Sequence, residues 1–225
     1  MQSVNRISAL TSGEALGIKN KLLAMRDKWV LHPDTIYTLG FPTYKTEERR
    51  NQLEIVEENS FLNETFGWLY GHLISACSEM LGEKVYLDPM IPFPGFHIFS
   101  VCSGREQYPA APIHSDESFR KVGGLEDCIA KQGDHWSVVL PISVPETGTA
   151  TDFFEPDPDK EGVSRSFEES HLYCLSAEHI TGELIVFDSF WPHRISAFEL
   201  SGSDDFRITF QSHLAKRNNK WILYW

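Results

Sequence analysis

The fold class is indicated most clearly by residues 182–188, which read GELIVFD. The apolar run 184–187, bounded by Gly182 and Glu183 on one side and Asp188 on the other, is typical of a buried β-strand. Short apolar or alternating runs, separated by Pro, Gly and Asp, recur from Lys84 onward at 85–87, 96–101, 136–142, 172–175, 206–213 and 221–224. This rhythm predicts a β-sandwich or barrel for that part of the chain.

Two helices are expected ahead of this β-rich part. Thr11 and Glu14 have the spacing of a capping box, and the apolar stripe that follows predicts a helix from about 12 to 30. A second helix is indicated by apolar residues at steps of three and four between residues 66 and 81, with Gly82 where the helix would stop. Helices first and strands afterwards argue against an alternating parallel βαβ fold. We therefore expect a mainly β protein whose helices cover one face of the sheet.

The length of the chain points to a single domain. Its 225 residues, of which 41% are hydrophobic and 23% charged, are enough for one well-buried core and rather few for two enzymatic domains. We expect residues 1–84 to pack on a β core formed by residues 85–225. Polar stretches at about 120–134 and 156–170 are expected to be loops inserted into that core, and they are candidates for a substrate lid.

Charge and cysteine content limit the classes of partner and the cellular compartment that fit this sequence. A formal net charge of −12 disfavours nucleic acid, because binding to a phosphate backbone relies on clustered Lys and Arg. The four cysteines form no C-x-x-C pair, and no stretch approaches the roughly 18 apolar residues of a membrane-spanning helix. Residues 1–10 lack a basic stretch followed by an apolar run. We therefore expect a cytoplasmic protein without a nucleic-acid or membrane partner, and the sequence leaves its oligomeric state open.

A candidate metal centre lies in the strand-rich part. His114 and Asp116 are two residues apart in a segment expected to be extended, so their side chains point to the same side. His193 follows the strand 182–188 and can close a triangle of ligands with them. Two imidazoles and one carboxylate on one face of an octahedron leave three positions open, which suits ferrous iron that takes a bidentate 2-oxo acid and O2. A second His-x-Asp, at 32–34, ends a helix and starts a turn, where an ordinary structural use is expected.

A candidate anion site follows the last of these residues. Arg207 lies 207 − 193 = 14 residues beyond His193 and shares one face of its expected strand with Thr209. A guanidinium that points into a barrel requires an anion. The distal carboxylate of 2-oxoglutarate would meet Arg207 bidentately, with a hydrogen bond from the Thr209 hydroxyl. The alternative is a structural Arg207 paired with Asp204 or Asp205.

The ordered set of these residues resembles the Fe(II)/2-oxoglutarate-dependent dioxygenase superfamily. The resemblance covers about 85–214 and consists of H-x-D at 114–116, the strand 182–188 that leads to His193, and R-x-T at 207–209. It implies a double-stranded β-helix core, of the jelly-roll or cupin-like kind, flanked by α-helices. It also implies the metal and co-substrate roles given above for these residues.

The resemblance further implies an activity. The expected reaction decarboxylates 2-oxoglutarate to succinate and CO2 while O2 oxidises a C–H bond of a small molecule, such as an amino acid or a natural-product intermediate, with ascorbate as a supporting reductant. In halogenating relatives a small residue replaces the carboxylate ligand. The presence of Asp116 therefore favours hydroxylation, or desaturation or ring closure by the same oxidant, over halogenation.

The sequence leaves two other functions open, and it also leaves open the roles of two other histidines. A cupin-type metal enzyme could use the same scaffold without 2-oxoglutarate, although Arg207 and Thr209 speak against it. A jelly-roll protein that binds ligands without catalysis is the other alternative. His97 and His135 lie in strand-like runs on either side of the first metal ligands, where they either line the cofactor pocket or belong to the core.

Overall fold

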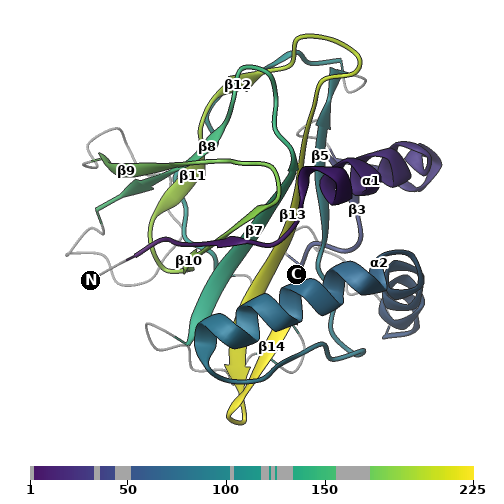
Figure 1. The fold of residues 1–225 in the computed structure, drawn as a ribbon, viewed down its shortest axis with the longest axis vertical. Coiled ribbons are helices and arrows are strands. Elements are labelled where there is room, and N and C mark those ends of the chain that lie inside the picture. The colour runs from purple at the N-terminus through teal and green to yellow at the C-terminus, as the bar shows by residue number, and fades with distance from the viewer. Residues whose placement is uncertain are drawn as a thin grey trace.

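The computed structural model describes residues 3–32, 36–43, 52–101, 104–117, 122, 125, 134–155 and 173–225 (Figure 1). In chain order the elements are β1 (Asn5–Ser8), α1 (Ser12–Leu23), the short 3-10 helix η1 (Arg26–Lys28), β2 (Val30–Leu31), β3 (Tyr37–Leu39), α2 (Gln52–Leu81), β4 (Val85–Tyr86), β5 (Gly95–Ser100), β6 (Gln107–Tyr108), β7 (His135–Ser143), β8 (Ala150–Phe154), β9 (Tyr173–Glu178), β10 (Glu183–Asp188), β11 (His193–Ile195), β12 (Phe198–Glu199), β13 (Phe206–Arg217) and β14 (Lys220–Tyr224). The protein is mainly β, as its sequence predicts.

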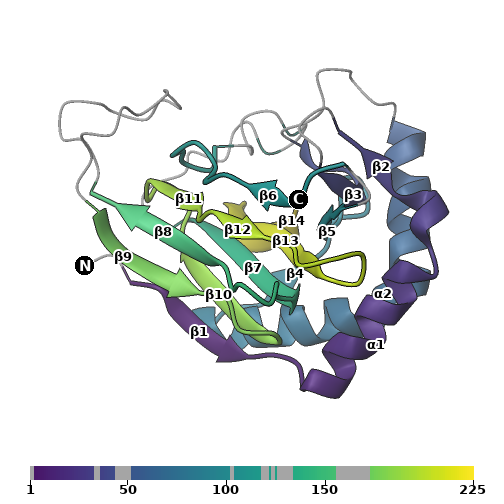
Figure 2. The same cartoon turned by 90° about the horizontal axis from the view of Figure 1, so that it is seen from above.

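The strands form two facing walls. Among the described residues, the large wall is a nine-stranded sheet in the order β1-β10-β7-β13-β5-β3-β2, with β14 and β4 attached beside β13. The small wall consists of the sheet β11-β8-β9 and its extension β12-β6. Figure 2 shows both α-helices on one side of the large wall and the small wall on the other side. Two walls around an interior make a double-stranded β-helix, which confirms the predicted fold class.

Residues 107–114 run along one edge of the small wall and join its two sheets. Tyr108 pairs with Phe198 in β12, and farther along Ala111 N donates to Ile195 O at 3.0 Å. This pairing along the edge of the small wall is antiparallel. The chain before the predicted metal ligands is therefore held in an extended conformation, as expected.

Strand β13 separates two environments. Phe206, Ile208 and Phe210 belong to the main hydrophobic core, which includes buried residues of α1 and α2. Arg207 and Thr209 alternate with them and face the interior between the walls. Each large apolar side chain that is buried contributes roughly 1.5–3 kcal/mol, and a slip by one residue would exchange the two faces. Burial of the apolar set therefore fixes the direction in which Arg207 points.

Helix α1 begins as predicted and ends earlier. Its capping box is formed, with Glu14 N donating to Thr11 Oγ1 at 3.3 Å and Thr11 N donating to Glu14 Oε2 at 2.7 Å. The expected range 12–30 is wrong at its end, because α1 stops at Leu23 and Val30 lies in β2. Strand β2 pairs with β3 at the edge of the large wall, so tertiary pairing overrides the local apolar stripe there.

Helix α2 covers the face of the large wall that points away from the interior. It is longer than the predicted range 66–81 and has a non-helical backbone at Phe66, with φ −127° and ψ 17°. Leu62, Leu69 and Leu73 are fully buried in the main core. Within the described part of the chain, no helix is long and apolar enough to cross a membrane.

Several strands have no counterpart among the predicted ones. Strand β8 pairs with both β9 and β11 and forms the middle of the small wall, while β1 and β3 pair with β10 and β5 of the large wall. The expected inserted loops at 120–134 and 156–170 lie outside the described residues, apart from Val122, Leu125 and Asp134.

The turn before β10 leads to a stability prediction. A Cβ added to Gly182, which has φ +82°, would lie 2.3 Å from the carbonyl oxygen of Leu10, whereas Gly148, with φ +77°, has nothing within 4 Å. We expect Gly182→Ala to lower the free energy of unfolding by roughly 1–3 kcal/mol more than Gly148→Ala, because both share the positive-φ penalty and only the first adds overlap. Urea unfolding measures the difference, and equal losses would contradict this account.

Candidate metal centre

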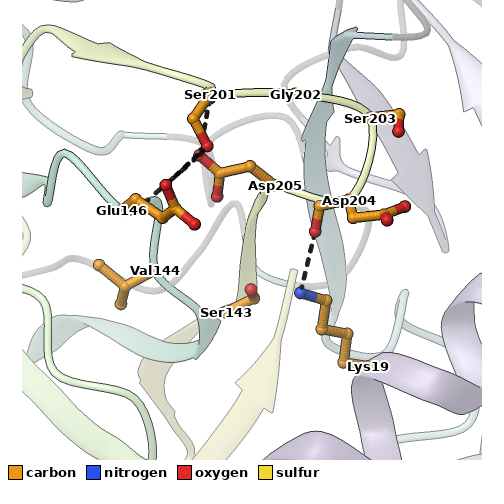
Figure 3. Close-up of a pocket in the computed structure, with 9 residues that line it drawn as sticks. All are labelled: Lys19, Ser143, Val144, Glu146, Ser201, Gly202, Ser203, Asp204 and Asp205. Atoms are coloured by element: carbon orange, nitrogen blue, oxygen red, sulfur yellow. Dashed lines mark hydrogen bonds between the residues drawn. The ribbon is translucent and has the colours of Figure 1, made fainter.

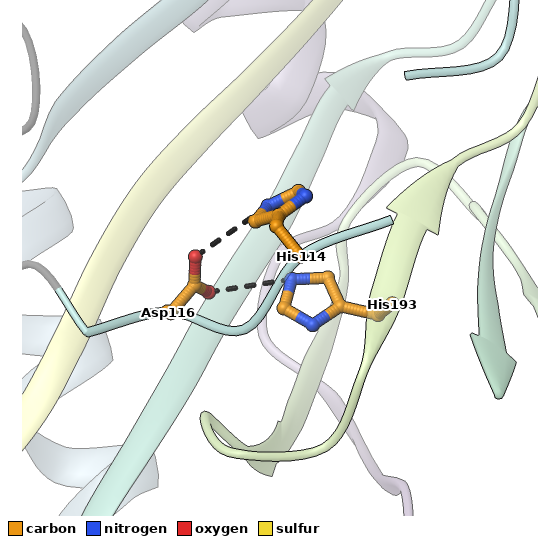
Figure 4. Close-up of side chains that lie close together, drawn as sticks. All are labelled: His114, Asp116 and His193. Carbon is orange, nitrogen blue, oxygen red and sulfur yellow. Dashed lines mark ion pairs between the residues drawn. The ribbon is translucent and has the colours of Figure 1, made fainter. Parts of the chain in front are cut away.

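The segment 114–116 meets His193 on the small wall. His114 N donates to His193 O at 2.9 Å, and His193 N donates to His114 O at 2.8 Å, which forms an antiparallel bridge. The amide of Asp116 donates to the carbonyl oxygen of Ser189 at 2.8 Å. Figure 4 shows the Asp116 carboxylate directed toward both imidazoles. The structure thus brings together the three side chains that the sequence singled out.

The spacing of the ligand atoms fits one metal ion. Asp116 Oδ1 lies 3.6 Å from His114 Nε2, and Asp116 Oδ2 lies 3.4 Å from His193 Nε2. One ligand atom from each residue lies within 4.8 Å of the others. Donors that bind an ion at about 2.0–2.2 Å are themselves separated by roughly 3 Å, so small movements bring all three onto one cation. Two imidazoles and one carboxylate with open positions are the donor set typical of non-haem Fe(II) oxygenases.

Backbone carbonyls orient the two imidazoles for metal binding. His114 Nδ1 lies 2.9 Å from Pro112 O, and His193 Nδ1 lies 2.7 Å from Trp191 O. A carbonyl oxygen can only accept, so each Nδ1 carries a proton, and in the neutral imidazole each Nε2 keeps a lone pair. Both lone pairs are therefore available to a cation, and the carbonyls also fix the ring orientation.

The Asp116 carboxylate is held from the large wall by Ser137. The Ser137 hydroxyl donates to Asp116 Oδ2 at 2.5 Å and lies 2.8 Å from Ser189 Oγ. Because its single hydrogen goes to the carboxylate, the Ser189 hydroxyl is the donor to Ser137. His213 Nδ1 lies 3.4 Å from Ser137 Oγ and 3.9 Å from Asp116 Oδ2. With Oδ2 held in this way, Oδ1 is the oxygen left for a metal.

The carboxylate is the anionic part of this group. Burial alone would raise the pKa of Asp116, but the neighbouring histidines, His193 first, hold it well below its usual range. Burial would lower the pKa of His193, and the Asp116 carboxylate raises it above its usual value. Burial is the main cause that lowers the pKa of His213 and that lowers the pKa of His135 to about 3. Asp116 is therefore ionised and these two neighbouring imidazoles are neutral at physiological pH, which favours a cation.

Arg207 is a buried cation in the same interior. It is 0% exposed, and its three guanidinium nitrogens have no hydrogen-bond partner among the described residues. Its guanidinium carbon lies 4.9 Å from the ring centre of Phe99 and 5.6 Å from that of Phe198. Thr209 is also fully buried, and its Oγ1 accepts from Gln211 Nε2 at 3.0 Å. Burial lowers the pKa of Arg207 to about 9, so the side chain stays charged at neutral pH and its surroundings fit an anion.

The acidic residues considered as alternative partners of Arg207 lie in a separate polar pocket of about 410 Å³, lined by Lys19, Ser143, Val144, Glu146 and residues 201–205 (Figure 3). Asp205 Oδ2 accepts from Ser201 N at 2.9 Å and from Ser201 Oγ at 3.2 Å. The carbonyl oxygen of Asp204 accepts from Lys19 Nζ at 3.4 Å. Among the described residues, neither Asp204 nor Asp205 forms an ion pair with Arg207, so that structural pairing is not made.

The other histidines singled out in the sequence lie outside the group of three. The ring of His97 packs 5.3 Å from that of Trp225, and His135 Nε2 lies 2.7 Å from the hydroxyl of Tyr224. His32 Nε2 lies 2.9 Å from Thr38 Oγ1, and Asp34 lies outside the described residues.

Sequence reasoning missed the residues that support Asp116. Ser137 in β7 and His213 in β13 are direct partners where these strands pair. Both lie on the face of the large wall that carries Arg207. The alternation that marked Arg207 and Thr209 would also have marked His213, four residues beyond Thr209. Ser189 gave no signal, because a Ser after a strand is common in turns.

Comparison with known proteins agrees with the fold. No protein-family model and no curated protein matches the sequence. The epimerase SnoN from nogalamycin biosynthesis, solved with Fe3+, alpha ketoglutarate and nogalamycin RO, aligns at 12% identity and TM-score 0.53 over 96% of this chain and 80% of that chain. The alpha ketoglutarate dependent carbocyclase SnoK aligns at 10% identity and TM-score 0.51, over 94% and 78%. An oxidoreductase of the 2OG-Fe(II) oxygenase family from Burkholderia pseudomallei aligns at 13% and 0.51, over 96% and 86%. The chain therefore has the double-stranded β-helix fold of these oxygenases.

Ser137→Ala should weaken metal binding at this centre. The variant loses the hydroxyl that orients Asp116, so we expect the dissociation constant for Co(II) to rise by roughly 10- to 100-fold, as when other hydrogen-bond partners of metal ligands are removed. Ser212→Ala is a matched control, because the Ser212 hydroxyl lies 3.4 Å from the Val138 carbonyl oxygen instead. Calorimetric titration with Co(II) measures both variants, and wild-type affinity in Ser137→Ala would exclude this role.

Proposed function

We propose that the protein is an oxygenase that binds Fe(II) through His114, Asp116 and His193 and uses 2-oxoglutarate as co-substrate. One observation carries the proposal: a cation-binding group and a buried, unpaired guanidinium, that of Arg207, face the same interior in the described part of the chain. A molecule that joins a metal-chelating 2-oxo acid to a distal carboxylate is complementary to both. The fold shared with SnoN, which was solved with Fe3+ and alpha ketoglutarate, supports the same pairing.

The metal ligands would determine which positions stay open. Two Nε2 atoms and one carboxylate oxygen would hold the iron, and this donor set would leave positions open for the 2-oxo acid and O2. When bound, iron and 2-oxoglutarate supply the oxidising chemistry: 2-oxoglutarate is decarboxylated to succinate and CO2 as O2 is reduced and a substrate C–H bond is oxidised. Because only Asp116 among the three proposed ligands is anionic, these residues would leave a bound ferrous ion with a net positive charge, which would favour the 2-oxo carboxylate.

Arg207 would bind the carboxylate distal to the 2-oxo group. A planar guanidinium matches a carboxylate through two parallel hydrogen bonds, and burial strengthens them. Thr209 can add a third, because its oxygen accepts from Gln211 and its own hydrogen remains available as a donor. The carboxylate would also neutralise a cation that is costly to bury alone.

An apolar cluster lines the interior beside the candidate metal ligands. Val139, Phe153 and Phe187 are buried together between the walls. The ring of Phe187 lies 4.7 Å from that of His193. Such a lining lowers the polarity on that side of His193 and strengthens the electrostatic interactions beside it.

We further propose that the reaction is hydroxylation of a small molecule. Asp116 fills the carboxylate position, which supports oxygenation over halogenation. SnoN and SnoK, named an epimerase and a carbocyclase, share the fold, so the same scaffold supports reactions other than hydroxylation. Mass spectrometry of metabolite pools incubated with the protein, Fe(II), 2-oxoglutarate and ascorbate distinguishes them. Gain of one oxygen atom indicates hydroxylation, and loss of two hydrogens indicates desaturation or ring closure.

His114→Ala and His193→Ala should each abolish the weak visible charge-transfer band expected when Fe(II) and 2-oxoglutarate are added without oxygen. Each variant lacks one of the three ligands that hold the iron to which the 2-oxo acid binds. His32→Ala, which changes a histidine outside the centre, should keep the band. Retention of the band and of normal iron binding in both ligand variants would show that the metal site is assigned wrongly.

Arg207→Gln should weaken 2-oxoglutarate binding by roughly 2–5 kcal/mol, the usual cost of truncating one partner of a desolvated charge pair, with much less effect on iron affinity. Calorimetric titration with 2-oxoglutarate measures the loss. An unchanged dissociation constant would favour a cupin-type metal enzyme that does not use 2-oxoglutarate.

The stability of the ligand-free protein is the control for this prediction. Arg207→Met replaces an unpaired buried cation by an apolar side chain, so the melting temperature should stay the same or rise. A clear fall would indicate that Arg207 has a structural role, because a structural partner would then have been lost.

A further inference from the structure

His179 is a buried histidine that the proposed iron and 2-oxoglutarate contacts do not use. It lies in the turn between β9 and β10 and is 6% exposed. Its Nε2 lies 3.0 Å from Thr151 Oγ1, whereas its Nδ1 is buried without a hydrogen-bond partner among the described residues. A buried polar atom without a partner is destabilising, so the position of Nδ1 points to a ligand as its partner.

Strand pairing places His179 near the end of the interior that holds Arg207. Strand β8 begins at Ala150, which pairs with the last residue of β9, immediately before His179. On its other side, Ala150 O accepts from Ser196 N at 3.0 Å. Two residues after Ser196, the ring of Phe198 lies against the Arg207 guanidinium at 5.6 Å. Adjacent segments of the small wall therefore link the turn that holds His179 to the ring that packs on the Arg207 guanidinium.

The two side chains also interact electrostatically. Burial lowers the pKa of His179 well below its usual range, and the positive charges of Arg207 and then Arg6 lower it further. The imidazole is therefore neutral at physiological pH and has a single N–H. If the Thr151 hydroxyl donates to Nε2, that hydrogen is on Nδ1, the atom that has no partner.

We propose that His179 and Thr151 form a neutral, hydrogen-bonding arm of the anion site whose charged arm is Arg207. The Thr151 hydroxyl donates to His179 Nε2, and His179 Nδ1–H donates to the carboxylate that Arg207 binds. The inference rests on the proposed function and deepens it, since the distal carboxylate of 2-oxoglutarate is then recognised from both walls. A neutral donor adds a hydrogen bond to the carboxylate without burying a second positive charge.

The test compares 2-oxoglutarate with 2-oxopentanoate, which has the same chain length and no distal carboxylate. Protein loaded with Mn(II) is titrated calorimetrically with each acid. His179→Phe should weaken 2-oxoglutarate binding by roughly 10- to 100-fold, the range for a lost hydrogen bond to a charged group, and leave 2-oxopentanoate binding unchanged. Thr151→Val should also weaken only 2-oxoglutarate binding, and by a smaller factor. Without the Thr151 hydroxyl, the single proton of the imidazole is shared between the two ring nitrogens and is on Nδ1 for only part of the time.

A matched control and Arg207→Gln separate the outcomes. His32→Phe removes a comparable pair, since His32 Nε2 lies 2.9 Å from Thr38 Oγ1 at the edge strands β2 and β3, and both affinities should stay at wild-type values. Wild-type 2-oxoglutarate affinity in His179→Phe, together with a loss in Arg207→Gln, overturns the inference and leaves the proposed function standing. Wild-type affinity in Arg207→Gln as well would contradict the proposed function.

Two further results are informative. Equal weakening of both acids in His179→Phe and Thr151→Val would assign the pair to the stability of the turn and overturn the inference. If His179→Phe does not fold, Thr151→Val decides by the same comparison of the two acids.

Discussion

The site depends on one backbone pairing, the reciprocal hydrogen bonds between His114 and His193. Residues opposite each other in a hydrogen-bonded antiparallel pair lie about 5.5 Å apart at Cα and project their side chains to the same face. The two imidazoles are therefore neighbours, with ring centres 4.6 Å apart. The same pairing continues through Ala111 and Ile195 into β6 and β12. The placement of the two imidazoles is thus a property of the small wall itself.

The interior contains two buried charges of opposite sign, and each of them is unfavourable without a ligand. Asp116 favours a cation at the small wall, and Arg207 favours an anion farther along β13. The same strand contributes Ile208 to the main core, so burial on one face offsets the cost of the charge on the other. Buried charges that lack a partner in the protein itself are expected where a protein binds ligands. The side chains that assist the two charged groups, Ser137 and His179, are neutral and therefore add no further buried charge.

The fold restricts the chemistry without selecting a product. The double-stranded β-helix is shared with an epimerase and a carbocyclase, although identity to either is 12% or less. In the proposed function the oxidising power comes from iron and 2-oxoglutarate, while the protein orients them and excludes water. The outcome then depends on which substrate atom is brought near the metal, and that is a property of side chains around the scaffold.

Local sequence was sufficient for features that involve residues close together in the chain. These are the capping box of α1, the strand at 182–188, and the alternation in β13 that directs Arg207 and Ile208 to opposite faces. The His-x-Asp at 114–116 was equally visible, since residues two apart in a strand share a face.

Other features needed the assembled chain. Val30 leaves the expected helix because β2 pairs with β3, and residues 150–154 become a strand because they lie between β9 and β11. Ser137 reaches Asp116 only because the large and small walls face each other. Each of these contacts joins segments distant in the chain, and the free energy of long-range pairing and burial leaves no periodic signal in a short window of sequence.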